Sequence, residues 1–354
     1  PQWSVKIAGG DITEQLPDYN SAWFEFTQPL MPGEVRKGEI SVERSHQGFA
    51  DSNTDTKLVA NGTFIDNWRL FPRFGYNDSY QLTDKHERRK RGLPELQRAN
   101  KLEDTQYYKQ SMFGANGGFI NFAATITTDE SQFAIAPGYL KSETVTDGRR
   151  TFRYEMDSPI INFYAILSAR LESKKITHNG VNVEVYYHQD HTWNVDRMIE
   201  SVTDSIDYFS AEFGPYQHKQ MRIIEFPGYE SFAQSFANTV PYSEQIGFIT
   251  DNRDSTKVDV PYYVTAHEVA HQWWGHQVTG ANVQGAAVLS ESLSQYSAIM
   301  VLKKKYGEQK LRKFLKYELD KYLQGRSVEA YQEMPLYKVE SQAHIYYQKG
   351  SEVM

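Results

Sequence analysis

Five consecutive residues in the C-terminal half of the chain, His267 to His271, carry the pattern H-E-x-x-H. On a helix, histidines four positions apart share one face, so both imidazoles can bind a single metal ion. Glu268 is then placed to take a proton from an attacking water without being a ligand itself. The pattern predicts a catalytic zinc site. The alternative is a helix with two ordinary core or surface histidines.

A catalytic zinc site requires a third protein ligand as well as one open position. His276 lies nine residues beyond His267, roughly 180° round an α-helix, so we expect it to face away. A carboxylate from a following helix is the remaining source, and Glu291 in the segment SESLSQY, residues 290–296, is the candidate. The residues alone leave open that Glu291 is an exposed helix acid.

Two segments, HEVAHQWWGHQVTG at 267–280 and LSESLSQY at 289–296, resemble zinc aminopeptidases of the aminopeptidase N and leukotriene hydrolase type, which are gluzincins. In that family a fixed number of residues separates the second histidine from the ligand Glu. In this sequence the same number of residues after His271 leads to Ser290. The resemblance therefore implies a one-residue insertion in the connecting loop, with Glu291 as the ligand. The acid usually found just before that Glu is replaced by Gly-Ala-Ala at 285–287.

The same resemblance implies roles for two further residues. Glu244, in the segment VPYSEQIG at 240–247, stands where the family has a Glu that holds the free α-amine of the substrate. The alternative for Glu244 is a surface acid on an edge strand. Tyr347, in the segment YQKG at 347–350, stands where the family has a Tyr that stabilises the tetrahedral intermediate.

The first half of the chain has the pattern of a β-rich domain. Short alternating runs at Glu39–Arg44, Phe133–Ala136 and Thr151–Met156 are separated by Gly, Pro, Asn and Asp, which predicts strands joined by turns. Residues 84–109 are polar and without a clear period, and we interpret them as a helical or irregular insertion. We place the end of this domain near residue 186.

After Tyr187 the pattern becomes helical. Apolar residues from Val195 to Phe213 recur at helical spacing, with Asn194 as the predicted N-cap. Two buried strands are predicted at Met221–Phe226 and Gln245–Ile249. Three more helices are predicted at Tyr262–Trp274, Val288–Tyr306 and Gln309–Leu323.

The resemblance implies an α+β multidomain fold. A saddle-like N-terminal β domain at 1–185 would precede a thermolysin-like zinc peptidase domain at 186–354. The chain begins at Pro1 and ends within an apolar helical pattern, so we expect a piece truncated at its C-terminus. Ser341–Met354 is predicted as the start of a helix. The resemblance implies that this helix would be supported by a further helical domain, whose sequence is not part of this chain. We therefore expect that helix to fray, leaving zinc bound and activity low because Tyr347 is poorly held.

Composition excludes several classes of function. The net charge of −7 argues against a nucleic-acid partner, and the absence of cysteine removes disulfides and thiolate chemistry. No apolar run is long enough to span a membrane. The segment HQWWGHQV is similar to segments of bacterial peptidase modules that are fused to permease-like membrane spans. That similarity implies that the chain is a soluble domain of a longer bacterial protein that is anchored in a membrane. The sequence does not indicate the cellular compartment.

The predicted function is a zinc-dependent aminopeptidase that hydrolyses the N-terminal bond of a peptide with a free N-terminus. Two alternatives remain: a zinc endopeptidase of the same class, and a non-catalytic peptidase-like binding module. The expected cofactor is one Zn²⁺ ion. The expected site consists of three metal ligands (His267, His271 and Glu291), two catalytic residues (Glu268 and Tyr347) and one substrate-binding residue (Glu244).

Overall fold

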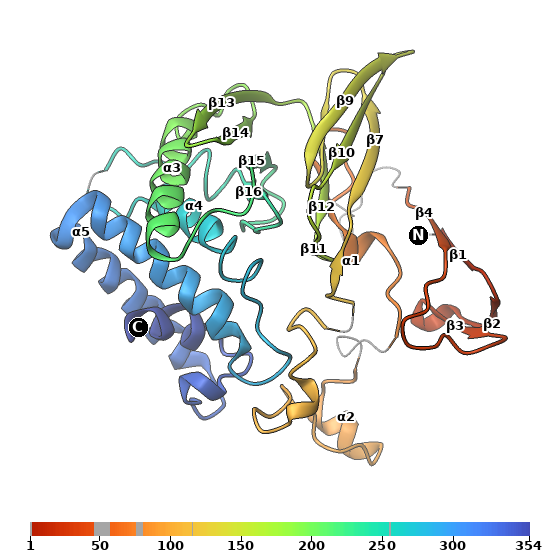
Figure 1. The fold of residues 1–354 in the computed structure, drawn as a ribbon. Coiled ribbons are helices and arrows are strands. Elements are labelled where there is room, and N and C mark those ends of the chain that lie inside the picture. The colour runs from red at the N-terminus through yellow and green to blue at the C-terminus, as the bar shows by residue number, and fades with distance from the viewer. Residues whose placement is uncertain (1, 46–56, 76–80, 115, 255) are drawn as a thin grey trace.

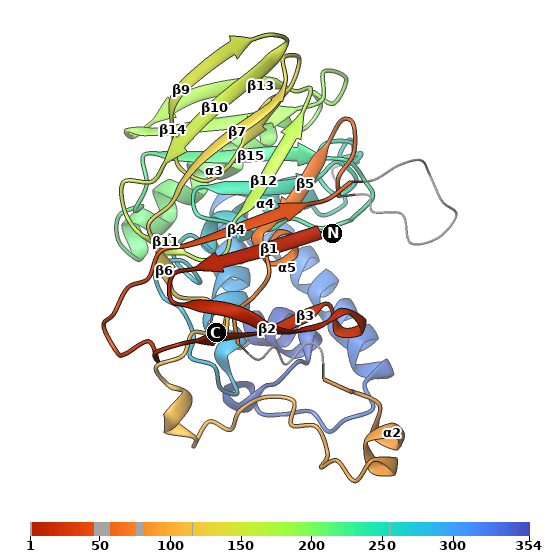
Figure 2. The same cartoon turned by 90° about the vertical axis from the view of Figure 1, so that its right-hand side faces the viewer.

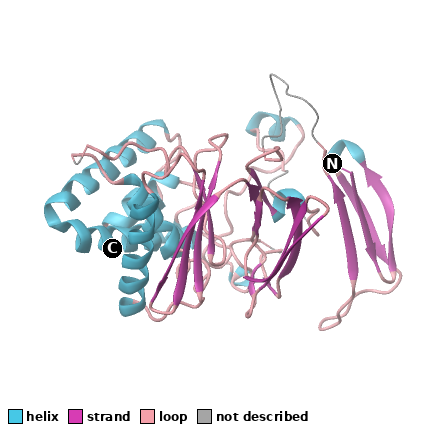
Figure 3. Ribbon diagram, turned by 90° about the horizontal axis from the view of Figure 1, so that it is seen from above, coloured by secondary structure: helices cyan, strands magenta, loops and turns pink. Residues whose placement is uncertain are grey.

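The computed structural model describes residues 2–45, 57–75, 81–114, 116–254 and 256–354. Seen from above, the molecule is a series of layers, with helices on one side, the first strands on the other and sheets between them (Figure 3). The strands come mostly from the first half of the chain and the long helices from the second half (Figure 1). This order matches the β-rich and mixed halves predicted from the sequence.

The first four strands form two antiparallel pairs, in which β1 lies beside β4 and β2 beside β3 (Figure 2). None of their residues is buried, and among the described residues they contribute nothing to the three buried apolar clusters. The strand predicted at Glu39–Arg44 is confirmed as β4. The elements of this segment are β1 (Gln2–Ile7), β2 (Gly10–Leu16), η1 (Pro17–Tyr19), β3 (Ser21–Phe26) and β4 (Gly38–Glu43).

The next segment forms three small antiparallel sheets, ordered β7-β10-β9, β5-β12-β8 and β11-β6. The strands predicted at Phe133–Ala136 and Thr151–Met156 are confirmed as β8 and β10. The insertion at 84–109 is mostly irregular and contains two short helices, α2 and η3. The elements are β5 (Thr63–Asp66), α1 (Asn67–Leu70), α2 (Lys85–Lys90), η3 (Thr105–Tyr107), β6 (Phe119–Ile120), β7 (Ala123–Asp129), β8 (Phe133–Ile135), β9 (Tyr139–Thr146), β10 (Arg149–Glu155), β11 (Ile160–Ile161) and β12 (Ala165–Ala169).

A four-stranded sheet supports the second half of the chain. Its strands are β13 (Glu172–His178), β14 (Val181–Tyr187), β15 (Gln220–Phe226) and β16 (Thr239–Ser243). β13 is antiparallel to β14, whereas β14, β15 and β16 run parallel. The boundary expected near residue 186 falls inside β14, and the valines of β14 belong to the same apolar cluster as α3 and α4. These valines therefore pack with the second half, whereas Tyr186 of the same strand packs in a cluster with Phe64 and Ile135 of the first half.

The strand predicted at Gln245–Ile249 is wrong, because these residues form a turn directly after β16. The turn is held by Asn194, whose side-chain amide donates to the carbonyls of Gly247 at 2.7 Å and Thr250 at 2.9 Å. Asn194 precedes helix α3 as predicted, but its side chain makes no cap hydrogen bond with the helix. The buried side-chain amide of Asn194 thus fixes the turn. The apolar pattern of residues 245–249, which predicted a strand, carries no information about this contact.

Helices cover one face of this sheet (Figure 1). The helices next to the sheet are α3 (Val195–Glu212) and α4 (Val260–Ala270). The helical elements that follow are the π-helical turn η4 (Val288–Ser292), α5 (Leu293–Val328), η5 (Leu336–Lys338), the π-helical turn η6 (His344–Lys349) and α6 (Gly350–Glu352). The two helices predicted at Val288–Tyr306 and Gln309–Leu323 are confirmed, since α5 is interrupted at Gly307, where φ is 75°. Within the described residues, no helix combines the length and apolar character needed to cross a bilayer.

Candidate active site

Helix α4 carries the H-E-x-x-H residues at its C-terminal end. Its start is fixed by Asp259, whose carboxylate accepts a hydrogen bond from the backbone N–H of Tyr262 at 3.2 Å, and by a proline in the first turn. Nine of its eleven residues are buried, including His267 and Glu268. The helix is therefore a rigid internal support, which is the kind of element that holds a catalytic group in a fixed geometry.

Three side chains converge at this end of α4. The Nε2 atoms of His267 and His271 lie 3.0 Å apart, and Oε2 of Glu291 lies 3.5 Å from each of them. Tetrahedral zinc with bonds of about 2.0–2.1 Å separates neighbouring ligand atoms by about 3.3 Å. Oε2 of Glu291 is buried and has no hydrogen-bond partner among the described residues. The spacing and the unpaired oxygen fit a zinc ion held by two nitrogens and one oxygen.

The ring of His271 is oriented by two neighbours. Its Nδ1 lies 3.0 Å from the backbone carbonyl of Trp274 and 3.0 Å from the hydroxyl of Ser294. A carbonyl can only accept, so Nδ1 carries a proton and Nε2 is the nitrogen that remains to bind a metal. Nδ1 of His267, by contrast, is buried with no partner among the described residues. Sequence reasoning missed Ser294, although it lies three residues after Glu291 on the same helix.

Glu291, and not Ser290, reaches the two histidines. Ser290 is buried, and its hydroxyl donates to the carbonyl of Ala287 at 3.5 Å. Both residues lie in the π-helical turn η4, Val288–Ser292, directly before α5. A π-turn is the form that a helix takes when it accommodates one extra residue. The additional residue inferred from the sequence therefore fits within the helix, and the connecting loop need not hold it.

The charges of the site stabilise one another. Burial works against the ionised carboxylate of Glu291, but His271 and His267 hold its pKa well below the usual range. Burial also lowers the pKa of His271, yet Glu291 and Glu268 outweigh it and raise that pKa to about 9. A metal that binds Nε2 of His271 at neutral pH must therefore displace a proton.

Glu268 is buried between this cluster and the segment that precedes β16. Its Oε2 has no hydrogen-bond partner among the described residues, and burial raises the pKa of its carboxyl. The hydroxyl of Ser235 donates to the backbone carbonyl of Glu268 at 2.9 Å, which fixes the main chain at this point. A desolvated carboxylate with a free oxygen beside a metal site is suited to proton transfer.

Tyr347 joins the site from the last helical segment of the chain. Its ring centroid lies 5.9 Å from that of His267, and burial together with the charge of Glu291 raises the pKa of its hydroxyl well above 10. The turn η6 that carries Tyr347 packs against α5 and η4. The expectation that Ser341–Met354 lacks packing partners is therefore wrong. Local sequence patterns do not reveal these contacts, because the partner residues lie about 50 positions earlier in the chain.

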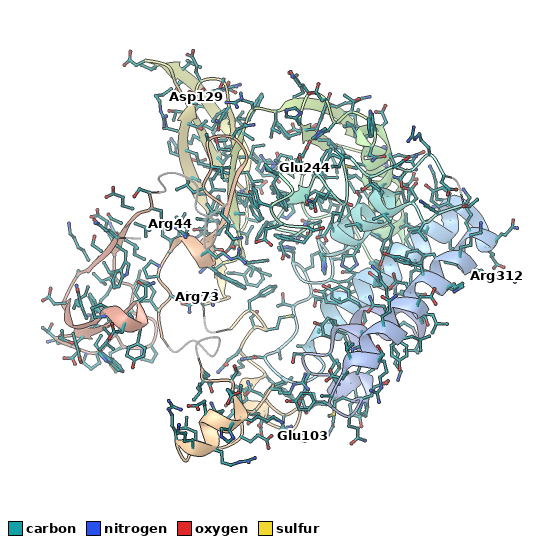
Figure 4. The ribbon with its side chains drawn as sticks, turned by 180° about the vertical axis from the view of Figure 1, so that it is seen from behind. Arg44, Arg73, Glu103, Asp129, Glu244 and Arg312 are labelled. Carbon is teal, nitrogen blue, oxygen red and sulfur yellow. The ribbon has the colours of Figure 1, made fainter. Side chains whose placement is uncertain are left out.

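Glu244 is not among the three side chains that converge as metal ligands, and its role as an amine anchor stays a prediction. Glu244 follows β16, and its Oε1 accepts a hydrogen bond from the backbone N–H of Gly228 at 2.8 Å, while Oε2 lies 3.9 Å from Nδ1 of His191. Figure 4 labels Glu244 beside the strands of the four-stranded sheet. On the other side of β16, Ser235 donates to the backbone carbonyl of Glu268, and Tyr242 within the strand belongs to the same buried apolar cluster as α4. His276, as expected, stays outside the cluster, with Nε2 3.2 Å from the carbonyl of Ser235.

Comparison with known proteins finds similarity to one peptidase family. The peptidase family M1 domain model matches residues 197–354. Aminopeptidase M1-B of Oryza sativa subsp. japonica is 25% identical over 262 residues, which cover 71% of this chain and 28% of that protein. Endoplasmic reticulum aminopeptidase 1 of Homo sapiens is 26% identical over 164 residues, covering 45% and 17%. The chain thus spans less than a third of the length of these relatives.

The fold is also similar to that of a solved structure. The crystal structure of an M1 zinc metallopeptidase from Deinococcus radiodurans superposes with a TM-score of 0.50 at 20% sequence identity. The match covers 66% of this chain and 51% of that one. It therefore extends beyond the residues that the family model matches and includes part of the β-rich half.

Proposed function

Since the peptidase family M1 domain model matches residues 197–354, we propose that this protein is a zinc-dependent aminopeptidase. The observation that carries the proposal is the convergence of His267, His271 and Glu291 at zinc-ligand spacing, with the buried Glu268 next to them. The substrate would be a peptide with a free N-terminus. The two curated relatives named above are both aminopeptidases.

The three converging side chains would hold one zinc ion. When bound, zinc supplies Lewis acidity that polarises a carbonyl and acidifies water. Oε2 of Glu268 would accept a proton from the attacking water and then deliver it to the nitrogen of the leaving amine. Tyr347 keeps its proton at neutral pH, so its hydroxyl would donate a hydrogen bond to the developing oxyanion.

One observation favours a second candidate, a zinc endopeptidase of the same class. The position of Glu244 beside His191 and Gly228 leaves it outside the proposed mechanism. Without that carboxylate, none of the residues assigned from the sequence would restrict cleavage to a chain end. A non-catalytic binding module has less support, because Glu268 has no ligand role and yet is buried with an unpaired oxygen.

The domain division is also a proposal. We infer a β-rich N-terminal unit and a catalytic unit that begins near residue 170, because β13 and β14 pair with each other and β14 continues into the sheet under α3 and α4. The β-rich unit would correspond to the saddle-like domain that the resemblance implies.

A single assay separates the three functions. The zinc-loaded protein is given an aminoacyl arylamide with a free amine, and an internally quenched peptide whose N-terminus is acetylated, each with and without a chelator. Chelator-sensitive hydrolysis of the free-amine substrate alone supports the aminopeptidase. Hydrolysis of the acetylated peptide supports the endopeptidase. A fully zinc-loaded protein that cleaves neither substrate would be a binding module.

A further inference from the structure

A second group of histidine and carboxylate side chains lies at the carboxyl edge of the four-stranded sheet. β14, β15 and β16 run parallel, so their carboxyl ends meet at one edge, where polar ligand sites are commonly built. His191 follows β14, Glu225 is the penultimate residue of β15, and Glu244 comes directly after β16. Three separate chain segments thus each contribute one metal-ligating side chain.

This group is distinct from the candidate active site. The segment before β16 contacts the end of α4, since Gln272 donates to the carbonyl of Phe236 at 2.9 Å. Glu244 lies at the other end of the strand. At about 3.3 Å per residue, the five residues of β16 separate its two ends by about 13 Å. The two groups share no residue.

The two carboxylates are held so that one oxygen of each faces the same point. Oε2 of Glu225 accepts a hydrogen bond from the backbone N–H of His188 at 2.6 Å, and Oε1 of Glu244 accepts one from Gly228 at 2.8 Å. The remaining oxygens, Oε1 of Glu225 and Oε2 of Glu244, both lie beside Nδ1 of His191. Any two of these three ligand atoms are within 4.8 Å. Fixed outer oxygens orient the inner ones, as around known metal sites.

The balance of charge also calls for a cation. Glu225 is 4% exposed and Glu244 only partly exposed, so two adjacent carboxylates are withdrawn from water. In the part of the chain that the structure describes, the ion-pair partner of both is the same residue, His191. A single imidazolium can neutralise one of the two charges, whereas a divalent cation neutralises both.

We propose that His191, Glu225 and Glu244 bind a second divalent cation of the zinc class, which fastens the carboxyl ends of three parallel strands. The ligand set is one imidazole nitrogen and two carboxylate oxygens, a combination that suits zinc. Nδ1 of His191 then carries no proton, and its hydrogen bond to Glu225 is replaced by ligation. The ring of His188 lies beside that of His191, with 4.9 Å between the two ring centroids.

The test is metal stoichiometry, measured by plasma mass spectrometry after chelation, reloading with Zn²⁺ and gel filtration. The wild-type chain is expected to hold two zinc ions, His267→Ala one, and the double variant His191→Ala/Glu244→Gln one. His178→Ala is the matched control, because His178 also pairs with a carboxylate, Asp207 at 2.7 Å, while no second carboxylate of the described residues converges there. This control should keep two ions.

The affinity of the second site is measured by zinc titration in the His267→Ala background, which makes the result independent of peptidase activity. Adding Glu244→Gln should weaken the remaining site at least about tenfold, since changes even outside the ligand shell cost that much. Circular dichroism of the metal-free variants establishes that they fold. One zinc ion in the wild-type chain, or two in the folded double variant, would overturn the proposal.

Discussion

The hydroxyl of Ser292 donates a hydrogen bond of 2.6 Å to the backbone carbonyl of Tyr346. This contact joins the π-helical turns η4 and η6, and the residue next to each partner is a proposed functional residue, Glu291 on one side and Tyr347 on the other. Two π-helical turns, a rare helical form, are thus hydrogen-bonded to each other at the candidate active site. Such π-turns are frequent at functional sites, where they redirect one side chain without ending the helix.

The separate roles of the ligand and the base can be distinguished by two substitutions. Glu291→Ala should lower zinc affinity by removing a ligand, and activity with it. Glu268→Ala should keep zinc bound and reduce kcat by at least about 100- to 10,000-fold, the usual contribution of a general base. Zinc content and kcat are measured on the same preparations. Ser290→Ala is the control and should retain zinc. An active Glu268→Ala enzyme would exclude Glu268 as the base.

Replacing Tyr347 by phenylalanine tests the oxyanion donor. The substitution removes one hydroxyl while the ring beside His267 remains, so zinc affinity should be unchanged. Loss of one such donor reduces kcat by about 100- to 1,000-fold. Steady-state kinetics on a free-amine substrate measure the effect. Tyr346→Phe serves as the matched control, and an equal loss in both variants would indicate a packing role for this pair of tyrosines.

The close approach of the two π-turns depends on Gly350. A Cβ atom at this position would lie 2.2 Å from Oγ and 2.9 Å from Cβ of Ser292, both on a short side chain that cannot move far. Gly350→Ala should therefore displace η6 from η4 and cost about 1–3 kcal/mol of stability, the usual range for overpacking. It should also lower kcat, because Tyr347 moves with η6. The midpoint of urea unfolding measures the first effect. Ser292→Gly by itself loses the hydrogen bond to Tyr346, so the clash is identified if Gly350→Ala costs less in the Ser292→Gly background than in the wild-type chain.

The parts of the fold that follow from local pattern were predictable. Helix α3 and the break at Gly307 can be read from apolar spacing and from glycine, and H-E-x-x-H identifies two ligands because four positions on a helix form one face. Contacts between distant segments were not predictable. The turn after Ser243 depends on a buried amide from Asn194 some 50 residues earlier. The position of Glu244 likewise depends on which end of β16 faces α4, and sequence spacing carries no information about that choice.

A buried histidine outside the candidate site should make stability depend on pH. His218 is 7% exposed, neither of its ring nitrogens has a hydrogen-bond partner among the described residues, and burial lowers its pKa to about 4. An unfolded chain has a histidine pKa of about 6.5, so between these two values the unfolded state binds the extra proton. The contribution of His218 to stability is therefore fully present above about pH 6.5. It is lost as the pH drops toward 4, by about 3 kcal/mol in total at 1.36 kcal/mol per pKa unit.

His218→Leu keeps a buried side chain of similar volume and removes the titrating group. Urea unfolding at pH 7 and pH 4.5 should show a gap between wild type and variant that grows by about 2–3 kcal/mol at the lower pH. A gap that stays constant across this range would mean that His218 is not held neutral in the folded protein.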